Sequence, residues 1–294
     1  MKRIPIIHNA LLLIFTTFVV GCSNQNADTK TITVSIQPIE SFVHSIVGDD
    51  YTINTLLPSG SSPESYSPTP SQLANIENSE FTFIIGTLDF EHSIVHRLAG
   101  RDINIVNTGK DAALIEGKCS HNHEVGHHHH HHSVDPHIWL SLTELEKIVH
   151  NIGDAICTAH PDSLHYKANY EQLIAKIQAA HNRNKVLFEQ QSGASFIIYH
   201  PALTYFARDY GLSQISVEHE GKAPTPSALT ELAKVVDNCP SRQLLYQREY
   251  PLDVVQPTAE ILGLTPIEIN PLSCDILSEL DRIANILLTP QDGK

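Results

Sequence analysis

PDSLHYKANYEQLIAKIQAAHNRNKVLFEQQ, residues 161–191, begins with proline and contains no glycine. Its apolar side chains recur with the period of an α-helix, and Asp162 or Ser163 can serve as the N-cap. These apolar positions are Tyr166, Tyr170, Leu173, Ile174, Ile177 and Ala180. At ~1.5 Å per residue such a helix could reach ~40 Å, which is longer than one small domain needs. The stretch therefore predicts a long helix that links two domains.

Short apolar, β-branched runs alternate with helical patterns on both sides of this helix. Before it, we expect strands at 31–36, 53–57, 81–86 and 103–107, and helices at 39–47, 71–78 and 141–160. After it, we expect strands at 195–199, 214–217, 243–246 and 266–269, and helices at 202–210, 227–236 and 253–262. This alternation predicts parallel strands with right-handed crossovers.

The predicted fold class is therefore α/β, with two Rossmann-like lobes built on parallel sheets and joined by one long backbone helix. The N-terminal lobe is expected at 31–160, the linking helix at 161–192 and the C-terminal lobe at 193–294. The sequence contains no Gly-x-Gly-x-x-Gly and no P-loop motif, so neither lobe carries a nucleotide-binding signal.

The first residues have the layout of an export signal. Lys2 and Arg3 precede an apolar stretch, 10–20, which ends at Gly21-Cys22. This stretch is too short for a membrane span, which needs ~20 residues. The pattern resembles a bacterial lipoprotein signal. We expect 1–21 to be removed, Cys22 to carry the lipid, and 22–30 to tether a protein that faces the periplasm or the cell exterior.

The composition favours a cation as the ligand. The chain has 33 acidic and 19 basic residues and a net charge of −14; loss of Lys2 and Arg3 with the signal leaves 17 basic residues and a charge of −16. This balance argues against nucleic acid, and we expect a monomer. Besides Cys22 there are four cysteines. A bridge between Cys239 and Cys274 and free buried thiols both stay open.

A histidine-rich segment lies at 119–133. Eight of the chain's 19 histidines fall in it: His121, His123, His127, His128, His129, His130, His131 and His132. Such a tract cannot pack a core, which predicts a solvated loop that gathers metal weakly. A purification tag is the alternative, but tags lie at chain ends. The segment also matches His-Glu-x-x-His at 123–127. Gly126 and the lack of apolar periodicity argue against the helix that a zinc hydrolase with Glu124 as base would need.

The ends of the predicted strands carry metal-binding side chains. In open parallel sheets, ligands bind outside the carboxyl ends of the strands. The segment after 53–57 contains Glu64, the segment after 103–107 ends at His137, and strands 195–199 and 266–269 lead into His200 and Asn270. Two imidazoles and a carboxylate, with the fourth position open or weakly filled, suit tetrahedral zinc.

Three motifs resemble the zinc and manganese solute-binding proteins of ABC importers, the cluster A-I or cluster 9 family. They are PSGSSPESYSPTPS at 58–71, DPHIWL at 135–140 and YHPALTYFARDYGL at 199–212, with weaker matches at 220–226 and 269–272. The resemblance covers about 31–290. It implies a metal in the cleft, held in part by His137 and His200, and delivery to a membrane permease powered by an ATPase.

Two positions depart from the family's pattern. The resemblance places a histidine where Glu64 stands and an acidic residue where Asn270 stands. Glu64 can still bind metal as a carboxylate, whereas Asn270 is a weak donor that leaves its position open to water. Glu249 and Asp275 are reserve carboxylates, and Asp135 could orient an imidazole. The imidazoles and the histidine loop favour Zn²⁺, with Mn²⁺ as the alternative. Binding should weaken as pH falls through ~6.5. A metal-storage or adhesin lipoprotein on the same fold is the remaining alternative.

Overall fold

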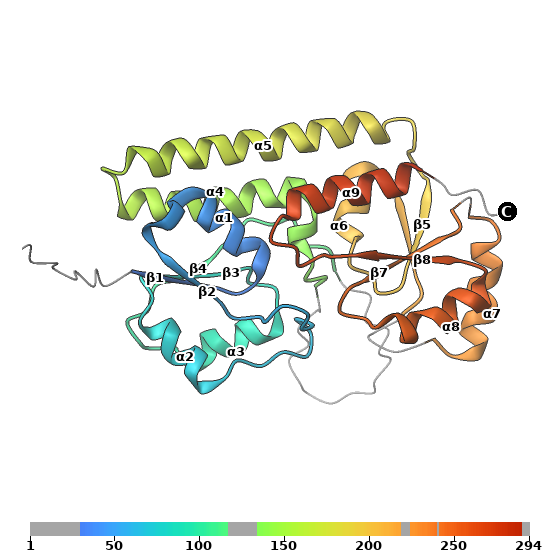
Figure 1. Ribbon diagram of the computed structural model, residues 1–294, viewed down its shortest axis with the longest axis horizontal. Coiled ribbons are helices and arrows are strands. Elements are labelled where there is room, and N and C mark those ends of the chain that lie inside the picture. The colour runs from blue at the N-terminus through green and yellow to red at the C-terminus, as the bar shows by residue number, and fades with distance from the viewer. Residues whose placement is uncertain (1–29, 117–133, 219–223, 240, 290–294) are drawn as a thin grey trace, which may run out of the picture.

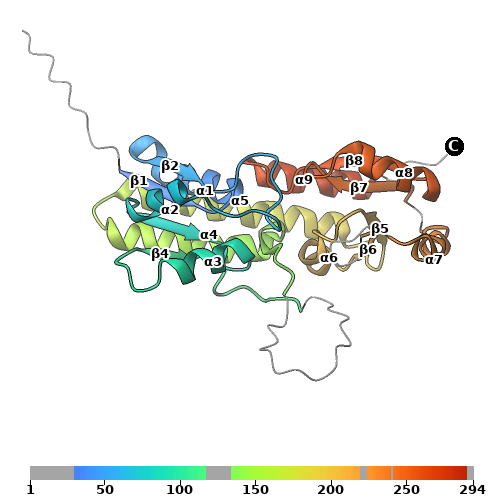
Figure 2. The same cartoon turned by 90° about the horizontal axis from the view of Figure 1, so that it is seen from below.

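The computed structural model describes residues 30–116, 134–218, 224–239 and 241–289. Within them the chain forms two α/β lobes that lie side by side along one long helix, α5 (Figures 1 and 2). Each lobe contains one four-stranded sheet, and every strand pairing in both sheets is parallel. The fold class expected from the sequence is confirmed.

The two sheets have the same strand order. The first runs β2-β1-β3-β4, with β1 at Thr31–Val34, β2 at Thr52–Thr55, β3 at Phe81–Ile84 and β4 at Ile105–Asn107. The second runs β6-β5-β7-β8, with β5 at Ser195–Ile198, β6 at Ser213–Ser216, β7 at Gln243–Gln247 and β8 at Thr265–Ile269. In each sheet the second strand along the chain lies on one side of the first strand, and the third strand lies on its other side. This reversal creates a switch point, where ligands of open α/β sheets bind.

Helices cover both faces of each sheet (Figure 1). In the first lobe they are α1 (Gln37–Val47), α2 (Pro70–Glu77), α3 (Asp89–Arg97) and α4 (Leu142–Ala159), with short 3₁₀ turns at Gly48–Asp50 and Ile138–Leu140. In the second lobe they are α6 (Thr204–Tyr210), α7 (Pro226–Val236), α8 (Leu252–Leu262) and α9 (Ile276–Leu288). No helix of the described residues is long and apolar enough to cross a membrane.

Helix α5, Leu164–Phe188, joins the lobes because its buried face meets both of them. It packs against α1 and α4 of the first lobe and against α6 and α9 of the second. Its buried side chains include Leu173, Ile177 and Phe188. The chain leaves the helix through Gly193, whose φ of 83° favours glycine. The hydrophobic core is consequently continuous from β1 to β5 and α9.

The structure differs from the sequence expectation at several elements. Helices α3 and α9 were not expected. Helix α3 is short and buries few apolar side chains, whereas α9 has a clear apolar period that starts after its N-cap, Asp275. Helix α6 starts at Thr204, later than 202, because the amide of Ala202 turns back to donate to the carbonyl of His200.

The described cysteines are free. They are Cys157, Cys239 and Cys274, so the bridge between Cys239 and Cys274 is absent. Cys239 is buried, and its Sγ donates to the carbonyl oxygen of Ser195 at 3.3 Å. Cys274 is exposed. Of the two alternatives left open by the sequence, the structure has free thiols, of which Cys239 is buried as expected and Cys274 is not.

Candidate metal centre

Three side chains from three strand ends meet between the lobes. Glu64 comes from the loop after β2, His137 from the segment after β4, and His200 from the turn after β5. One potential ligand atom from each lies within 4.8 Å of the others. Among the described residues this is the only group of three or more histidine, cysteine, aspartate or glutamate side chains that meets this condition. The rings of His137 and His200 are 5.3 Å apart between centroids.

His137 is buried and held by Asp135. Its Nδ1 is 2.9 Å from Asp135 Oδ1, and its backbone amide donates to the same oxygen at 3.0 Å. Burial disfavours the charge of Asp135, but these hydrogen bonds outweigh it and hold the pKa of that carboxyl below its usual value. Because Nδ1 is engaged, Nε2 is the nitrogen left for a ligand. The second-lobe residue Tyr205 donates to the carbonyl of Asp135 at 2.7 Å.

His200 is buried between two carboxylates, one on each ring nitrogen. Its Nδ1 is 2.8 Å from Glu218 Oε2, and its Nε2 is 3.0 Å from Glu64 Oε1. Burial alone would lower the pKa of His200, but hydrogen bonds to Glu218 and Glu64 raise it to about 9. The hydrogen bond from His200 in turn lowers the pKa of Glu64. A cation that binds Nε2 must therefore replace a proton there.

Glu218 is itself fixed in place. It is buried, and Tyr250 donates to the same Oε2 that faces His200, at 3.0 Å. Burial and the neighbouring Glu218 raise the pKa of Tyr250, which keeps its hydroxyl a donor. The carbonyl of His200 accepts a hydrogen bond from Gln247 Nε2 at 3.0 Å. The His200 ring and backbone are thus both held from the second lobe.

The three side chains line one small cavity of about 30 Å³. The first lobe contributes Ser62, Pro63, Glu64, His137 and Trp139, and the second contributes His200, Ala202, Gln247, Glu249, Tyr250, Pro271 and Leu272. Pockets for organic ligands are typically ~300–1,000 Å³, whereas one water needs ~10–15 Å³ of cavity volume. The cavity therefore suits a small ion with one or two waters and excludes an organic ligand.

The structure does not bring every expected residue to this cavity. Asn270 is not among the residues that line it, although its neighbours Pro271 and Leu272 are, and its backbone amide donates to Glu279 at 2.6 Å. Asp275 is directed elsewhere, because its side chain accepts from the amide of Ser278 and caps α9. Glu249 does line the cavity, and burial raises the pKa of its carboxyl.

Sequence reasoning missed Glu218, Gln247 and Tyr250. Glu218 follows the predicted strand 214–217, and Gln247 ends β7, so the rule that singled out His200 also applied to them. The remaining expectations lie outside the described residues. These are lipid attachment at Cys22, the base Glu124, and the eight histidines of the 119–133 segment, namely His121, His123 and His127 to His132.

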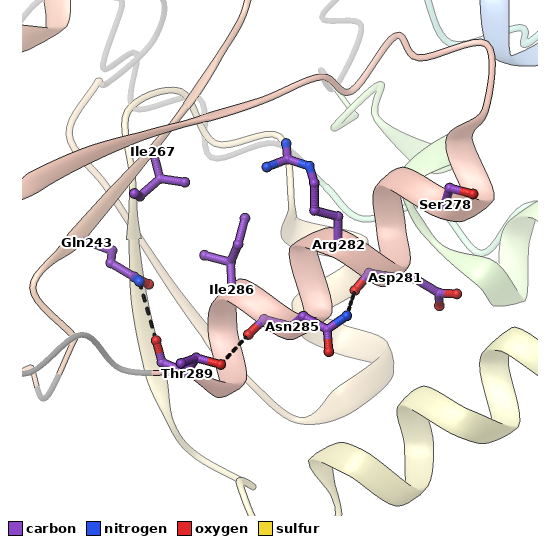
Figure 3. Close-up of a pocket in the computed structure, with 8 residues that line it drawn as sticks. All are labelled: Gln243, Ile267, Ser278, Asp281, Arg282, Asn285, Ile286 and Thr289. Atoms are coloured by element: carbon purple, nitrogen blue, oxygen red, sulfur yellow. Dashed lines mark hydrogen bonds between the residues drawn. The ribbon is translucent and has the colours of Figure 1, made fainter.

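A larger hollow of about 520 Å³ lies on the second lobe between β7, β8 and α9 (Figure 3). Three of its polar or charged side chains already have partners. Gln243 donates to the carbonyl of Thr289, Arg282 pairs with Glu279, and Asp281 pairs with Arg183. It contains no cluster of metal-binding side chains among the described residues. We therefore assign the candidate site to the interlobe cavity.

Two parallel-sheet lobes on one backbone helix are the architecture of two-lobed solute-binding proteins, and the histidine–carboxylate cavity between the lobes is a candidate site for a small cation. Comparison with protein-family models gives a match over residues 32–281. The chain belongs to the family described as the periplasmic component A of the zinc-uptake complex, ZnuA.

Named relatives agree with this membership. The zinc-binding lipoprotein AdcA of Streptococcus pneumoniae is 29% identical over 282 residues, which cover 92% of this chain and 56% of AdcA. The high-affinity zinc uptake system protein ZnuA of Bacillus subtilis is 31% identical over 222 residues, covering 73% of this chain and 69% of ZnuA. This chain thus spans little more than half the length of AdcA.

Solved structures have the same fold. A zinc-bound ZnuA deletion mutant superposes with a TM-score of 0.78 and 26% identity, covering 91% of this chain and 100% of that one. The periplasmic zinc-binding protein TroA of Treponema pallidum superposes with a TM-score of 0.76 at 14% identity, covering 89% and 99%. The second likeness concerns the fold alone.

Proposed function

We propose that this protein captures Zn²⁺ in the interlobe cavity and delivers it to the permease of an ABC importer powered by an ATPase. Glu64, His137 and His200 are the proposed ligands. The observation that carries the proposal is their convergence within 4.8 Å in a cavity with room for an ion and little more. The names of AdcA and ZnuA, which refer to zinc, support the choice of ion.

The chemistry of the three side chains suits zinc. Two imidazole nitrogens and a carboxylate oxygen are common zinc ligands, at ~2.0–2.2 Å. Asp135 and Glu218 hold the two rings by their Nδ1 atoms, an arrangement that orients imidazoles and makes them better donors. Mn²⁺ prefers more oxygen ligands, so a site with two imidazoles favours Zn²⁺. Capture and release require no covalent step, and we propose no catalysis.

We further propose that Cys22 carries a lipid and that 22–30 tether a monomeric, exported domain to the membrane. The lobes and linking helix would keep the boundaries 31–160, 161–192 and 193–294. The signal-like layout of 1–21 supports the export, and "lipoprotein" in the name of AdcA supports the anchor.

The histidine segment at 119–133 is proposed to gather zinc weakly near the cavity. Glu116 and Val134, which flank this segment, form an antiparallel bridge and therefore lie side by side. Deletion of 119–133 can therefore leave the lobe intact. We expect the deletion variant to keep one tight zinc site while the total zinc bound per chain falls, as measured by equilibrium dialysis. Loss of the tight site would make the segment the main site instead.

Zinc uptake by living cells tests the transport role. Cells that lack this protein should grow poorly in zinc-depleted medium and regain growth with the unaltered gene, but not with His137→Ala/His200→Ala. Normal growth and normal uptake of radioactive zinc in the deletion strain would favour storage or adhesion. The hydrolase alternative requires peptidase activity that disappears in Glu124→Gln; we expect none in either protein.

A further inference from the structure

Gln247, the last residue of β7, has a buried amide oxygen with no partner. Gln247 lines the interlobe cavity and is 3% exposed. Nε2 donates to the carbonyl of His200 at 3.0 Å, but Oε1 accepts no hydrogen bond. Of the few such buried atoms among the described residues, only this one belongs to a residue that lines the cavity. A buried acceptor is normally satisfied by protein, water or ligand.

The proposed zinc site also lacks a fourth ligand. Zinc in proteins is usually four-coordinate, and among the described residues only Glu64, His137 and His200 bring ligand atoms within 4.8 Å of one another. Asn270 is not among the residues that line the cavity. The cavity volume leaves room for one water beside the ion. The missing ligand and the unpaired acceptor are thus found in the same small space.

A second acceptor lines the same space. Glu249 lies two residues beyond Gln247 and also lines the cavity, without belonging to the three-residue cluster. A metal-bound water uses one lone pair on the ion and has two hydrogens to donate. The two hydrogens match the two acceptors at the end of β7.

We infer that the fourth position of the ion is a water molecule whose hydrogens are accepted by Gln247 Oε1 and the Glu249 carboxylate. This inference rests on the proposed zinc site. It makes Gln247 and Glu249 positioning residues for the captured ion. A water is also a ligand that leaves readily, which suits a carrier that must release its ion.

Substitutions at Gln247 separate its two hydrogen bonds. Both Gln247→Met and Gln247→Glu remove the donor to the His200 carbonyl, but only the glutamate keeps an oxygen near the ion. We expect Gln247→Met to weaken zinc affinity about tenfold to a hundredfold and Gln247→Glu to weaken it less. Gln243→Met is the matched control. Gln243 lies on the same strand, is buried, and donates to a backbone carbonyl, but it lines the other hollow.

Competitive zinc titration of the mature chain measures these affinities. Equal losses in Gln247→Met and Gln247→Glu, or no loss in Gln247→Met, would overturn the role of Oε1. If Gln243→Met also lost affinity, the effect would come from damage to the lobe, and the inference would fail on this test.

A crystal structure of the zinc-loaded protein gives the direct test. The inference requires an oxygen of water on the ion, within hydrogen-bond distance of Gln247 Oε1 and Glu249. A direct bond from either side chain to zinc would overturn it and leave the proposed function standing. Zinc absent from Glu64, His137 and His200 would overturn both.

Discussion

His200 lies between the carboxylates of Glu64 and Glu218, and this position makes the proposed zinc binding a proton exchange. The pKa of His200 is raised to about 9 in the metal-free protein, so at neutral pH Nε2 carries a proton that the ion must displace. The sequence alone suggests that zinc binding weakens around the usual histidine pKa of ~6.5. The two carboxylates move the midpoint of this pH dependence upward.

Zinc affinity should accordingly rise up to about tenfold per pH unit between pH 7 and 9 and level off above about 9. Zinc affinity rises with pH because zinc competes with a proton for His200, and this proton is bound more tightly than the proton of an ordinary imidazole. Competitive titration across pH 6–10 measures this dependence, and weakly buffered mixing at pH 7.5 should detect about one proton released per zinc. An affinity that is flat above pH 7 would contradict the raised pKa.

The carboxylate of Glu218 should matter for the metal although it does not belong to the ligand group. Glu218→Gln keeps a side chain of the same size but removes the charge that holds His200 Nδ1. We expect zinc affinity at pH 9 to fall about tenfold to a hundredfold. The midpoint of the pH dependence of zinc affinity should move to lower pH. The exposed Glu231→Gln on α7 is the control and should leave both unchanged. An unchanged affinity and midpoint in Glu218→Gln would count against an orienting role.

The sequence predicts that Glu64, His137 and His200 come together because each lies beyond the end of a strand, and strand ends of parallel sheets converge. Their role as metal ligands stays a prediction. The sequence cannot predict which neighbours of a strand end face the cavity. Asn270 and Glu249 illustrate this limit, since both follow strands but only Glu249 lines the cavity. Side-chain direction depends on the turn that each strand makes, and turn geometry is a tertiary property.

At the scale of elements, α5 is the part of the fold that the sequence predicts most directly. A long apolar period with no glycine leaves few alternatives, and the observed helix, Leu164–Phe188, lies within the predicted stretch. The eight predicted strands also coincide with observed strands to within a few residues. Helix α3 was missed because it buries little apolar surface, so periodicity gives it no clear signal.

The buried face of α5 should stabilise the whole molecule. Ile177 is fully buried in the core that continues across both lobes. Ile177→Ala should lower the free energy of unfolding by about 2–5 kcal/mol, measured by urea denaturation, with a single transition and unchanged zinc stoichiometry. Lys176 is its exposed neighbour on the same helix, and Lys176→Ala should change the free energy of unfolding by no more than about 0.5 kcal/mol. Two separate transitions, with only one affected, would contradict the shared core.

At the scale of the whole molecule, the cavity lies between two lobes that α5 and several direct contacts hold together. His137 comes from one lobe and His200 from the other, and Trp139 Nε1 donates across the interface to the carbonyl of Pro271 at 2.9 Å. The repeated sheet order gives each lobe a switch point that faces this interface. The domain boundaries, the lipid anchor and the role of the histidine segment stay predictions.

The central claim is that the tight zinc site is the interlobe cavity. Competitive zinc titration of residues 23–294 beside His137→Ala/His200→Ala tests it most directly. We expect one tight site in the unaltered protein that disappears in the double variant, while the weaker sites of the histidine segment persist. Tight binding that is unchanged in the double variant would contradict the account and move the site to the 119–133 segment.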